Sequence, residues 1–475
     1  MRKKTSIIKI IILVMMLNGI ENIAIAQTQQ AFLIGNWIGK IEFQGKQLAL
    51  YFRVNYLSKD SVQAYMDSPD QGAKDIKVSK LTIKGDSVFI RVKSLGVGIS
   101  GSLNMNDSSI TAIFRQSIFN CPIILKKVEK LPQINRPQEP KPPYPYLTTE
   151  VSFENTAAKI EFSGTLTTPE ANGKFPAVVM ITGSGPQNRD EELLGHKPFL
   201  VIADYLSRNG IAVLRYDDRG IGKSKGNFSS ATSFDFAADA NAAVNYLKTL
   251  SNIDSNRIGI IGHSEGGLIA PIIASSNPSV RFIVLLAGPG LNGAEILLLQ
   301  SALIAKADGE TNENIKNART MNKQTYRIIN NEKDNTLAAQ KISKAFDRYI
   351  SKLPKEDGIK LESQKDMMIQ QILTPWFRTF LSLDPKTYLQ KTHCAVFALN
   401  GAKDLQVPAD ENLAAIEKYL TKAGNKNYQL QKLPNLNHLF QNCQSGSPEE
   451  YSKIEETFSP AALLMIKDWI WKIIK

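Results

Sequence analysis

Residues 257–275 read RIGIIGHSEGGLIAPIIAS, and this stretch decides the fold class. The apolar run Ile258–Ile261 predicts a buried strand, and Gly266–Ser275 predicts a helix that follows almost at once. Between them, Gly262-His263-Ser264-Glu265-Gly266 matches the pattern Gly-x-Ser-x-Gly. In a sharp strand-to-helix turn this pattern exposes the serine hydroxyl, and the flanking glycines let strand and helix approach closely. We therefore predict Ser264 as a nucleophile at the N-terminus of a helix.

The chain contains four histidines, His196, His263, His393 and His438, so the search for a catalytic base is short. A serine hydroxyl becomes nucleophilic when a base removes its proton. After a turn of this kind the partners follow in the order acid, then histidine, which leaves His393 and His438. His393 opens a predicted strand at the end far from the reacting edge, so we interpret it as structural. We predict His438, in a loop that returns over the carboxyl edge of the sheet, as the base.

The acid that orients this imidazole should follow a strand that ends at the same edge of the sheet. Asp404 comes just after the predicted strand Val396–Asn400, within Gly401–Pro408. Asp410 is the competing carboxylate, but its position favours a role as the N-cap of the next helix. We therefore predict Asp404 as the acid of the triad.

Acyl transfer also needs two hydrogen-bond donors for the negative oxygen of the tetrahedral intermediate. One should be the backbone N–H of Glu265, directly after the nucleophile. The other should come from Gly183-Ser184-Gly185-Pro186, which follows the predicted strand Ala177–Thr182 and whose glycines let the backbone face the substrate. We choose Ser184 as this donor, with Gly185 as the alternative; a simple glycine turn is compatible with the same residues.

A second glycine-containing stretch, Gly220-Ile221-Gly222-Lys223-Ser224, is similar to the end of a phosphate-binding loop. The first glycine of that motif would have to stand where the chain has Asp217, so the match fails. We interpret Asp217-Asp218-Arg219-Gly220 as a structural turn at the sheet edge. The predicted chemistry requires neither a metal nor an organic cofactor.

Strands and helices alternate around the Ser264 motif, which predicts a parallel sheet with helices on both faces. The alternation stops near residue 291 and resumes with a strand at Ala395–Leu399. Residues from about 291 to 390 keep helical spacing instead. An ordinary extra helical layer would explain them, but their place after a strand's carboxyl end favours an inserted cap over the active site. Within it, Pro375-Trp376-Phe377 offers bulky apolar walls for an acyl pocket.

A different pattern precedes this region. Residues 31–129 contain about eight short alternating segments, separated by turn signals and without a helix, which predicts a small all-β barrel or sandwich. Six prolines between Leu131 and Tyr146 mark residues 130–146 as an extended, semi-rigid linker. Residues 147–475 are then the α/β domain.

Residues 1–26 have the pattern of a secretory signal peptide, with cations at Arg2–Lys4, an apolar stretch at Ile7–Leu17 and the cleavage site Ala24-Ile25-Ala26. An uncleaved membrane anchor is the alternative, but this apolar stretch is too short to span a bilayer. We therefore predict an exported protein, periplasmic or extracellular, with no membrane span after cleavage.

The composition narrows the remaining classes of protein. The 475 residues, 43% of them hydrophobic, exclude a disordered chain, and three cysteines exclude a disulfide scaffold. A bridge between Cys394 and Cys443 is an alternative to three buried thiols. The formal net charge of +12 is spread along the chain without a dense basic block, so we expect no nucleic-acid partner. Nothing in the pattern indicates an oligomeric state.

Together these stretches resemble the α/β-hydrolase superfamily, and more narrowly the exported esterase-D-like family of bacteria, from about Tyr144 onward. The resemblance is carried by Gly183–Asp190, Tyr216–Gly220, the Ser264 turn, Gly401–Pro408 and Asn437–Phe440. It implies hydrolysis of carboxylic esters, with Ser264, Asp404 and His438 as the triad. The chain also resembles the serine-aminopeptidase-like branch. One departure is Thr182, where many relatives in the wider superfamily carry histidine before the glycine.

The leading hypothesis is therefore a serine esterase acting on small-molecule esters with short to medium acyl chains. A peptidase or amidase on the same triad is the first alternative. It would need an acidic pocket for an amino terminus, and the available acids are Glu265, Asp190, Glu191 and Glu192. A second alternative is a binding protein whose function lies in residues 31–129.

Overall fold

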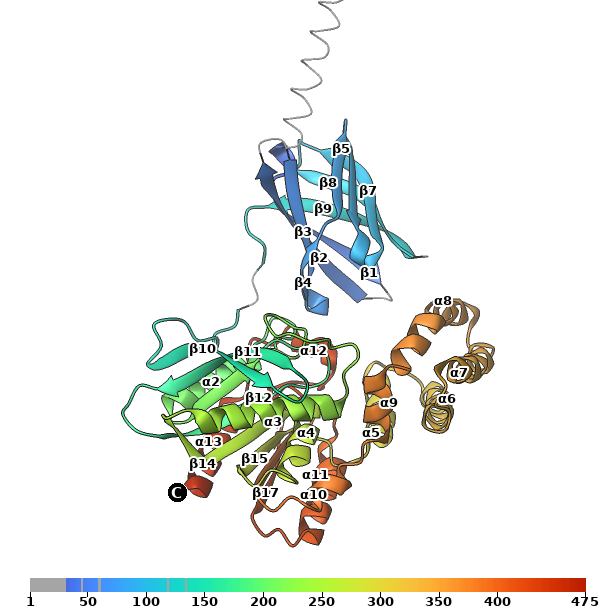
Figure 1. Ribbon diagram of the computed structural model, residues 1–475. Coiled ribbons are helices and arrows are strands. Elements are labelled where there is room, and N and C mark those ends of the chain that lie inside the picture. Colours follow the sequence, from blue (N-terminus) through green and yellow to red (C-terminus); the bar gives the residue numbers. More distant parts are fainter. Residues whose placement is uncertain (1–30, 44–45, 59–60, 118, 133–134) are drawn as a thin grey trace, which may run out of the picture. The chain divides into compact units, whose positions relative to one another are not determined.

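The computed structural model describes residues 31–475 apart from 44–45, 59–60, 118 and 133–134 (Figure 1). The predicted signal peptide, residues 1–26, lies outside the described residues. The chain forms two compact units, one ending at Asn135 and the other comprising Arg136–Lys475. The first unit is all-β and the second is α/β.

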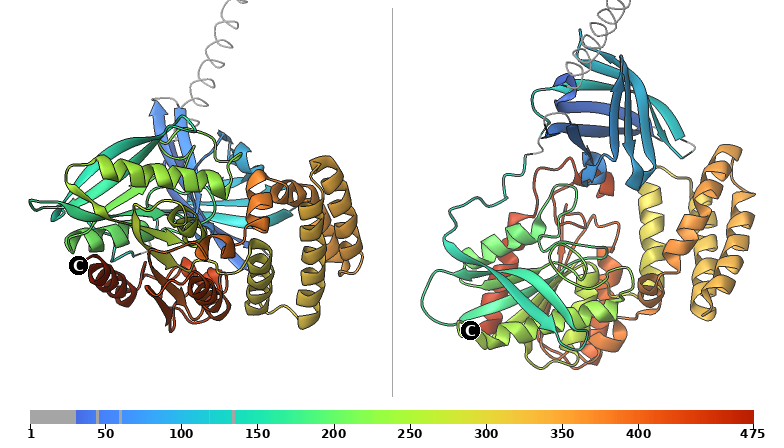
Figure 2. Two further views of the ribbon diagram at one scale, coloured as in Figure 1. Left: turned by 60° about the horizontal axis from the view of Figure 1, so that its bottom comes forward. Right: turned by 45° about the horizontal axis from the view of Figure 1, so that its top comes forward.

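The first unit is an antiparallel sheet that curves into a half-barrel, with the strand order β4-β3-β2-β1-β9-β8-β7-β6-β5 (Figure 2). Its strands are β1 Gly35–Phe43, β2 Lys46–Ser58, β3 Ser61–Ser68, β4 Ala73–Lys77, β5 Lys80–Lys84, β6 Ser87–Val92, β7 Val97–Asn104, β8 Ser109–Gln116 and β9 Phe119–Val128. Alternate residues of β6 are buried, while Phe89 and Arg91 between them are exposed. One face of the sheet therefore packs on the core and the other faces solvent.

One apolar segment of this unit folds differently from its pattern. Residues 76–83 read as a single strand, but the structure divides them between β4 and β5. At the division Val78 is buried, and its N–H donates to the carbonyl oxygen of Ala64 on β3 at 2.9 Å. The chain thus turns between β4 and β5, which are the two outer strands of this sheet.

The second unit contains an eight-stranded sheet in the order β10-β11-β13-β12-β14-β15-β16-β17. Its strands are β10 Tyr146–Asn155, β11 Ile160–Pro169, β12 Phe175–Ile181, β13 Ala212–Tyr216, β14 Ile253–His263, β15 Val280–Leu286, β16 Ala395–Gly401 and β17 Tyr428–Leu433. The pairs from β13 to β17 are parallel, and β10 and β11 are antiparallel. Because both faces of the parallel part are covered, its inner strands β12 and β16 are almost entirely apolar and buried.

Helices cover both faces of this sheet, as predicted. On one face lie α3 Ser233–Thr249, α4 Glu265–Ala274 and α11 Ala409–Lys422. On the other lie α2 Pro198–Arg208 and α13 Pro460–Ile474. Together with the turn after β14, this arrangement is the α/β-hydrolase fold.

In the order of the chain, the helical insertion comes after β15 and before β16 (Figures 1 and 2). Its helices are α5 Gly293–Ala307, α6 Asn312–Asn331, α7 Asn335–Ile350, α8 Lys355–Ile372, α9 Pro375–Ser382 and α10 Lys386–Leu389. Apolar side chains of α6, α7, α8 and α9 form a core of their own, separate from the two cores of the sheet. We call residues 293–389 the helical insertion below.

The proline-rich segment after Asn135 is hydrogen-bonded to the second unit. The Arg136 guanidinium donates to four backbone carbonyl oxygens, those of Leu194, Gly195, Ser452 and Ile454. Gln138 accepts from the N–H groups of Thr457 and Phe458 at 2.6 and 3.0 Å. The start of this segment therefore belongs to the α/β unit.

Two further sequence questions are answered by the structure. The three cysteines are free thiols, so the bridge considered between Cys394 and Cys443 is absent. Within the described ranges, the structure contains no helix of the length and apolarity needed to cross a membrane.

Candidate active site

Ser264 stands at the turn between β14 and α4 with φ 52° and ψ −116°. A positive φ is costly for a non-glycine residue and persists only where the surroundings hold it. Here the N–H of Ser264 donates to the carbonyl oxygen of Leu286 on β15 at 2.8 Å, and its own carbonyl accepts from Gly267 at 2.9 Å. The backbone therefore presents the Ser264 side chain at the carboxyl edge of the sheet.

The two glycines of the motif are required by close backbone contacts. A Cβ atom on Gly262 would lie 2.1 Å from the carbonyl oxygen of Gly266. A Cβ atom on Gly266 would lie 2.1 Å from the carbonyl oxygen of Ile181 on β12. Strand β14 and helix α4 approach this closely because neither position carries a side chain.

Asp404 and His438 are joined directly. The Nδ1 atom of His438 lies 2.8 Å from Oδ2 of Asp404, and both side chains are buried. The other carboxylate oxygen of Asp404 accepts from the N–H groups of Gln406 and Val407 at 2.8 and 2.9 Å. With Nδ1–H donating to the carboxylate, Nε2 of His438 keeps its lone pair and can accept a proton.

His263, which precedes Ser264 in the chain, contacts His438 directly. The rings of His263 and His438 have centroids 4.9 Å apart, and Nε2 of His263 lies 3.0 Å from the carbonyl oxygen of His438. Among the described residues, the Ser264 hydroxyl forms no hydrogen bond with His438. Such contacts are often long in enzymes without substrate and tighten in the substrate complex.

Glu191, which the sequence offers only as an acid for an amino-terminus pocket, is buried and has a different part at this edge. Its Oε1 atom accepts from the N–H of Gly183 at 2.6 Å and lies 2.8 Å from Nδ1 of His263. Glu191 thereby ties the loop after β12 to the residue before Ser264. It is 72 residues from His263 in sequence, and no spacing pattern connects the two.

His263 faces an acceptor on each side. A carboxylate and a backbone carbonyl can only accept, so a ring that bonds both Glu191 and the His438 carbonyl must donate from both nitrogens. Burial disfavours the charged ring, but the neighbouring Glu191 carboxylate outweighs it and raises the pKa of His263. The two hydrogen bonds and the raised pKa both favour a protonated His263 ring beside the Glu191 carboxylate.

The loop after β12 contains the N–H groups predicted to supply the second oxyanion donor. A Cβ atom on Gly183 would lie 3.3 Å from Cβ of Ser264, so this loop lies beside Ser264. The N–H of Gly183 is already bonded to Glu191, which leaves the next residues, Ser184 and Gly185, to face a substrate. The N–H of Glu265 opens helix α4 and has no partner within that helix.

The Glu265 side chain links the nucleophile turn to the helical insertion. It is fully buried and accepts from the hydroxyl of Ser233 at 2.6 Å and from Nε1 of Trp376 at 2.9 Å. Burial raises the pKa of Glu265, and the two hydrogen bonds oppose that rise. Trp376 lies on α9, so a residue predicted to line an acyl pocket contacts Glu265, the residue after Ser264.

The turn after β13 has a positioning role. Asp217 accepts from the backbone and side chain of Arg189, and Asp218 accepts from the hydroxyl of Thr182 at 3.0 Å and the N–H of Gln187 at 3.0 Å. Burial raises the pKa of Asp218 to about 8. These contacts hold the loop after β12.

Two other residues lie away from the Asp404–His438 pair. His393 is exposed beside the start of β16. Asp410 does not cap helix α11, because Pro408 takes the N-cap position; Asp410 lies in the first turn and pairs with Lys432 at 2.7 Å. The predicted N-cap was therefore wrong, since the fixed φ of proline sets the entry of this helix two residues earlier.

Comparisons with known proteins agree with this description. A family model described as serine aminopeptidase, S33, matches residues 198–442. Esterase EstD of Thermotoga maritima is 33% identical over 147 residues, or 31% of this chain and 35% of that protein. Thiohydrolase apmlB of Arthrinium phaeospermum is 32% identical over 115 residues, or 24% of this chain and 35% of that protein. The chain thus spans about a third of the length of these two relatives.

The Pyrococcus furiosus esterase Pf2001 matches with a TM-score of 0.42 and 17% identity, over 73% of this chain and 100% of that one. The α/β hydrolase GrgF from Penicillium matches with a TM-score of 0.42 and 17% identity, over 69% of this chain and 98% of that one.

Proposed function

Because the chain belongs to the serine aminopeptidase S33 family and has the α/β-hydrolase fold, we propose that it is a serine esterase acting on small carboxylic esters. Ser264 is the nucleophile, His438 the general base and Asp404 the residue that orients His438. The single observation that carries this proposal is the 2.8 Å hydrogen bond between His438 Nδ1 and Asp404, at the edge where the strained Ser264 turn ends.

The reaction follows from the roles of these groups. The Oγ atom of Ser264 attacks the acyl carbonyl while Nε2 of His438 takes its proton, and Asp404 stabilises the imidazolium that forms. The N–H of Glu265, with that of Ser184 or Gly185, holds the oxyanion. His438 then protonates the leaving alcohol, and a water that it activates releases the acid from Ser264.

The helical insertion supports a preference for short to medium acyl chains. Trp376 stacks on Phe380 at a centroid distance of 5.3 Å and packs with Leu268 of α4. This apolar group stands directly beside the nucleophile turn. We infer that it limits the length of the acyl group that Ser264 can attack.

Fluorophosphonate labelling followed by peptide mapping tests the nucleophile. The label should lie on Ser264, and Ser264→Ala should lose p-nitrophenyl acetate hydrolysis by at least about 10⁴-fold. Ser230→Ala, an exposed serine elsewhere in the unit, is the matched control and should keep wild-type activity. A label on another residue, or an active Ser264→Ala, would refute the proposal.

A panel of substrates tests the class of bond. We expect esters with acyl chains of two to about eight carbons to be cleaved faster than longer ones, and faster than aminoacyl p-nitroanilides. Faster cleavage of the anilides would mean that the protein is a peptidase using the same triad and not an esterase.

We also propose that the protein is exported and cleaved after Ala26. The cationic start, apolar stretch and small-residue site of the first 26 residues support this. Mass spectrometry of the exported protein should find Gln27 at its amino terminus. A full-length chain retained in the cell membrane would contradict it.

A further inference from the structure

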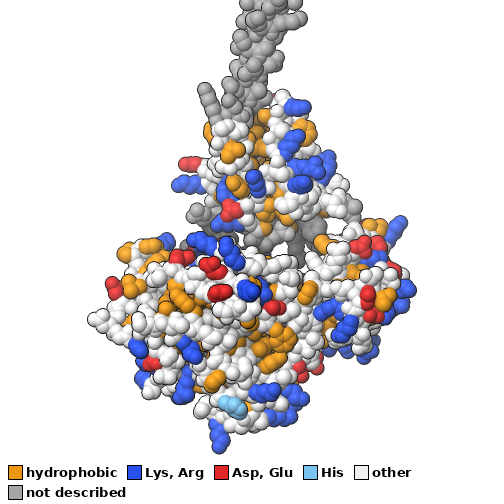
Figure 3. Space-filling view, in the orientation of Figure 1, with side chains coloured by type: hydrophobic (Ala, Val, Ile, Leu, Met, Phe, Trp, Pro, Cys, Tyr) orange, Lys and Arg blue, Asp and Glu red, His pale blue; other side chains and the backbone are white. Residues whose placement is uncertain are grey.

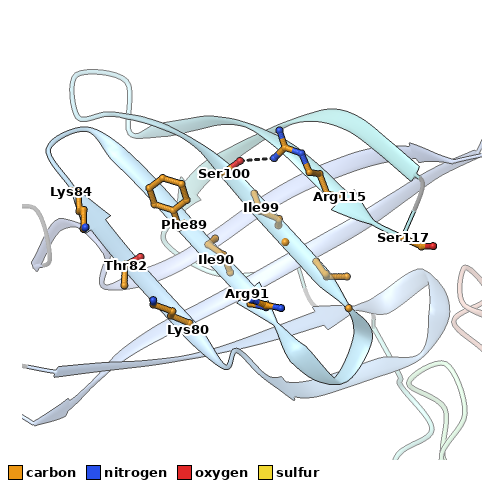
Figure 4. A pocket seen from close by; sticks show the side chains of 13 residues that line it. Lys80, Thr82, Lys84, Phe89, Ile90, Arg91, Ile99, Ser100, Arg115 and Ser117 are labelled. Atoms are coloured by element: carbon orange, nitrogen blue, oxygen red, sulfur yellow. Dashed lines mark hydrogen bonds between the residues drawn. The ribbon is translucent and has the colours of Figure 1, made fainter.

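The exposed face of the half-barrel contains a hollow of about 600 Å³ over strands β5 to β8 (Figure 4). In Figure 3, lysine and arginine side chains of the first unit gather over these strands. We call this feature the cationic hollow. Its side chains that face solvent are Lys80, Thr82, Lys84, Phe89, Arg91, Ser100, Arg115 and Ser117.

Strand register places three of the four cations of the hollow in one row. Lys80 on β5 lies opposite Arg91 on β6, Arg91 lies opposite Gly98 on β7, and Gly98 lies opposite Arg115 on β8. Residues directly opposite one another on antiparallel strands share a face of the sheet. A Cβ atom on Gly98 would meet nothing within 4 Å, so the space between the two arginines is open.

In the part of the chain that the structure describes, the cations of this row form no ion pair with a carboxylate. Like charges directly opposite one another destabilise a sheet, yet Lys80 and Arg91 hold that position. Strands β5 to β8 contain no aspartate or glutamate, and among the described residues no carboxylate forms an ion pair with the four cations of the hollow. By contrast, Arg53 on β2 pairs with two aspartates at 2.8 and 2.6 Å. The hollow therefore attracts an anion.

The neighbouring row supplies different chemistry. Thr82, Phe89 and Ser100 lie opposite one another on β5, β6 and β7. The Phe89 ring is 47% exposed, and Ser100 accepts from Arg115 Nη1 at 2.6 Å, which fixes that guanidinium (Figure 4). The row thus combines an aromatic face with hydroxyl groups that can donate and accept.

We propose that the cationic hollow binds a linear polysaccharide of uronic acids. Guanidinium groups match carboxylates bidentately, the hydroxyls of Thr82 and Ser100 match those of a sugar, and Phe89 offers a surface for one sugar ring. Sites for single-stranded nucleic acid stack successive bases on several aromatic rings, whereas the hollow has one. A membrane surface is planar, whereas the hollow is concave and has free space above Gly98. Its shape therefore fits a chain of sugars better than a membrane.

Binding of an oligogalacturonate to the full chain, measured by calorimetry, tests this site. The double variant Arg91→Ala, Arg115→Ala should weaken binding at least about tenfold, because hydrogen bonds to charged groups are lost. The control Lys74→Ala, Lys126→Ala removes the same charge from exposed positions of the same unit outside the hollow, and should stay within about twofold. Arg91→Lys, Arg115→Lys keeps the charge and should also weaken binding, since the planar forks are lost.

The ligand panel decides between classes of partner. Neutral dextran should not bind, and Phe89→Ala should weaken oligogalacturonate binding further. Tighter binding to single-stranded DNA or to phosphatidylglycerol vesicles than to the uronate would overturn the proposal, as would equal losses in the two double-alanine variants. Thermal melting of each variant confirms that the fold is intact, and no readout depends on the esterase reaction.

Discussion

At the scale of single residues, the carboxylate of Asp404 determines which nitrogen of His438 carries the proton. Asp404→Asn should lower kcat for p-nitrophenyl acetate by about 10⁴-fold, because an amide can stabilise the wrong tautomer. Asp410→Asn is the matched control, since Asp410 is exposed and pairs with Lys432. Equal losses in both variants would show that Asp404 is not the acid.

The His263–Glu191 pair predicts a dependence of stability on pH. Although burial opposes it, Glu191 raises the folded-state pKa of His263. The pair's contribution to the free energy of unfolding is therefore complete below the unfolded pKa of about 6.5, and is lost as pH rises through the raised folded value. In urea denaturation, the stability gap between wild type and Glu191→Gln should narrow as pH increases.

Glu192→Gln serves as the control for this experiment, because within the described ranges the hydrogen bonds of Glu192 are with Asn188 and not with His263. Its stability difference from wild type should not change over the same pH range. A gap for Glu191→Gln that widens toward high pH would mean that His263 is neutral in the folded protein.

At the scale of elements, the crossing of β14 and α4 depends on Gly266. Gly266→Ala places a Cβ atom 2.1 Å from a backbone oxygen of β12, so the helix must shift. We expect it to lower the free energy of unfolding by about 1–3 kcal/mol and to reduce activity. Gly358→Ala on α8 meets only ordinary contacts at 3.5 Å and should be neutral or stabilising by up to about 1 kcal/mol. Urea denaturation of both variants checks the contrast.

Helix α9 is joined to the nucleophile turn through one indole N–H. Trp376→Phe removes the donor to the buried Glu265 carboxylate and should cost about 1–3 kcal/mol of unfolding free energy. Trp471→Phe removes a bond to a neutral carbonyl, that of Asn209, and should cost less. If urea denaturation gives Trp471→Phe the larger loss, the charge of Glu265 does not matter to this contact.

Features made by residues adjacent in the chain could be predicted from the sequence better than contacts between distant residues. The turn at Ser264 and the α/β pattern were predictable because strand, glycines and helix are adjacent in the chain. The proximity of Asp404 and His438 was predictable because each follows a strand that ends at one edge. Glu191 was not, because its partners meet it only after folding. The division of residues 76–83 depends on the bond from Val78 to Ala64, which no local pattern encodes.

At the scale of the whole molecule, the α/β unit should fold without the half-barrel. A truncated chain that starts at Arg136 keeps that residue's four bonds to backbone carbonyls and should melt like the same unit in the full protein. A chain that starts at Tyr144 loses them, together with the Gln138 bonds, and should melt several degrees lower, since about 1 kcal/mol shifts Tm by roughly 2–4 °C at this size. Calorimetry of both chains provides the measurement, and equal melting temperatures would contradict the prediction.

One oxygen atom of Glu191 bonds to two parts of the site at once. One is the loop after β12, through Gly183, and the other is His263, next to Ser264. Neither part can drift without straining the other. In a library of random replacements, this position should therefore tolerate almost nothing, although its side chain is separated from any ester by the residues that it holds in place.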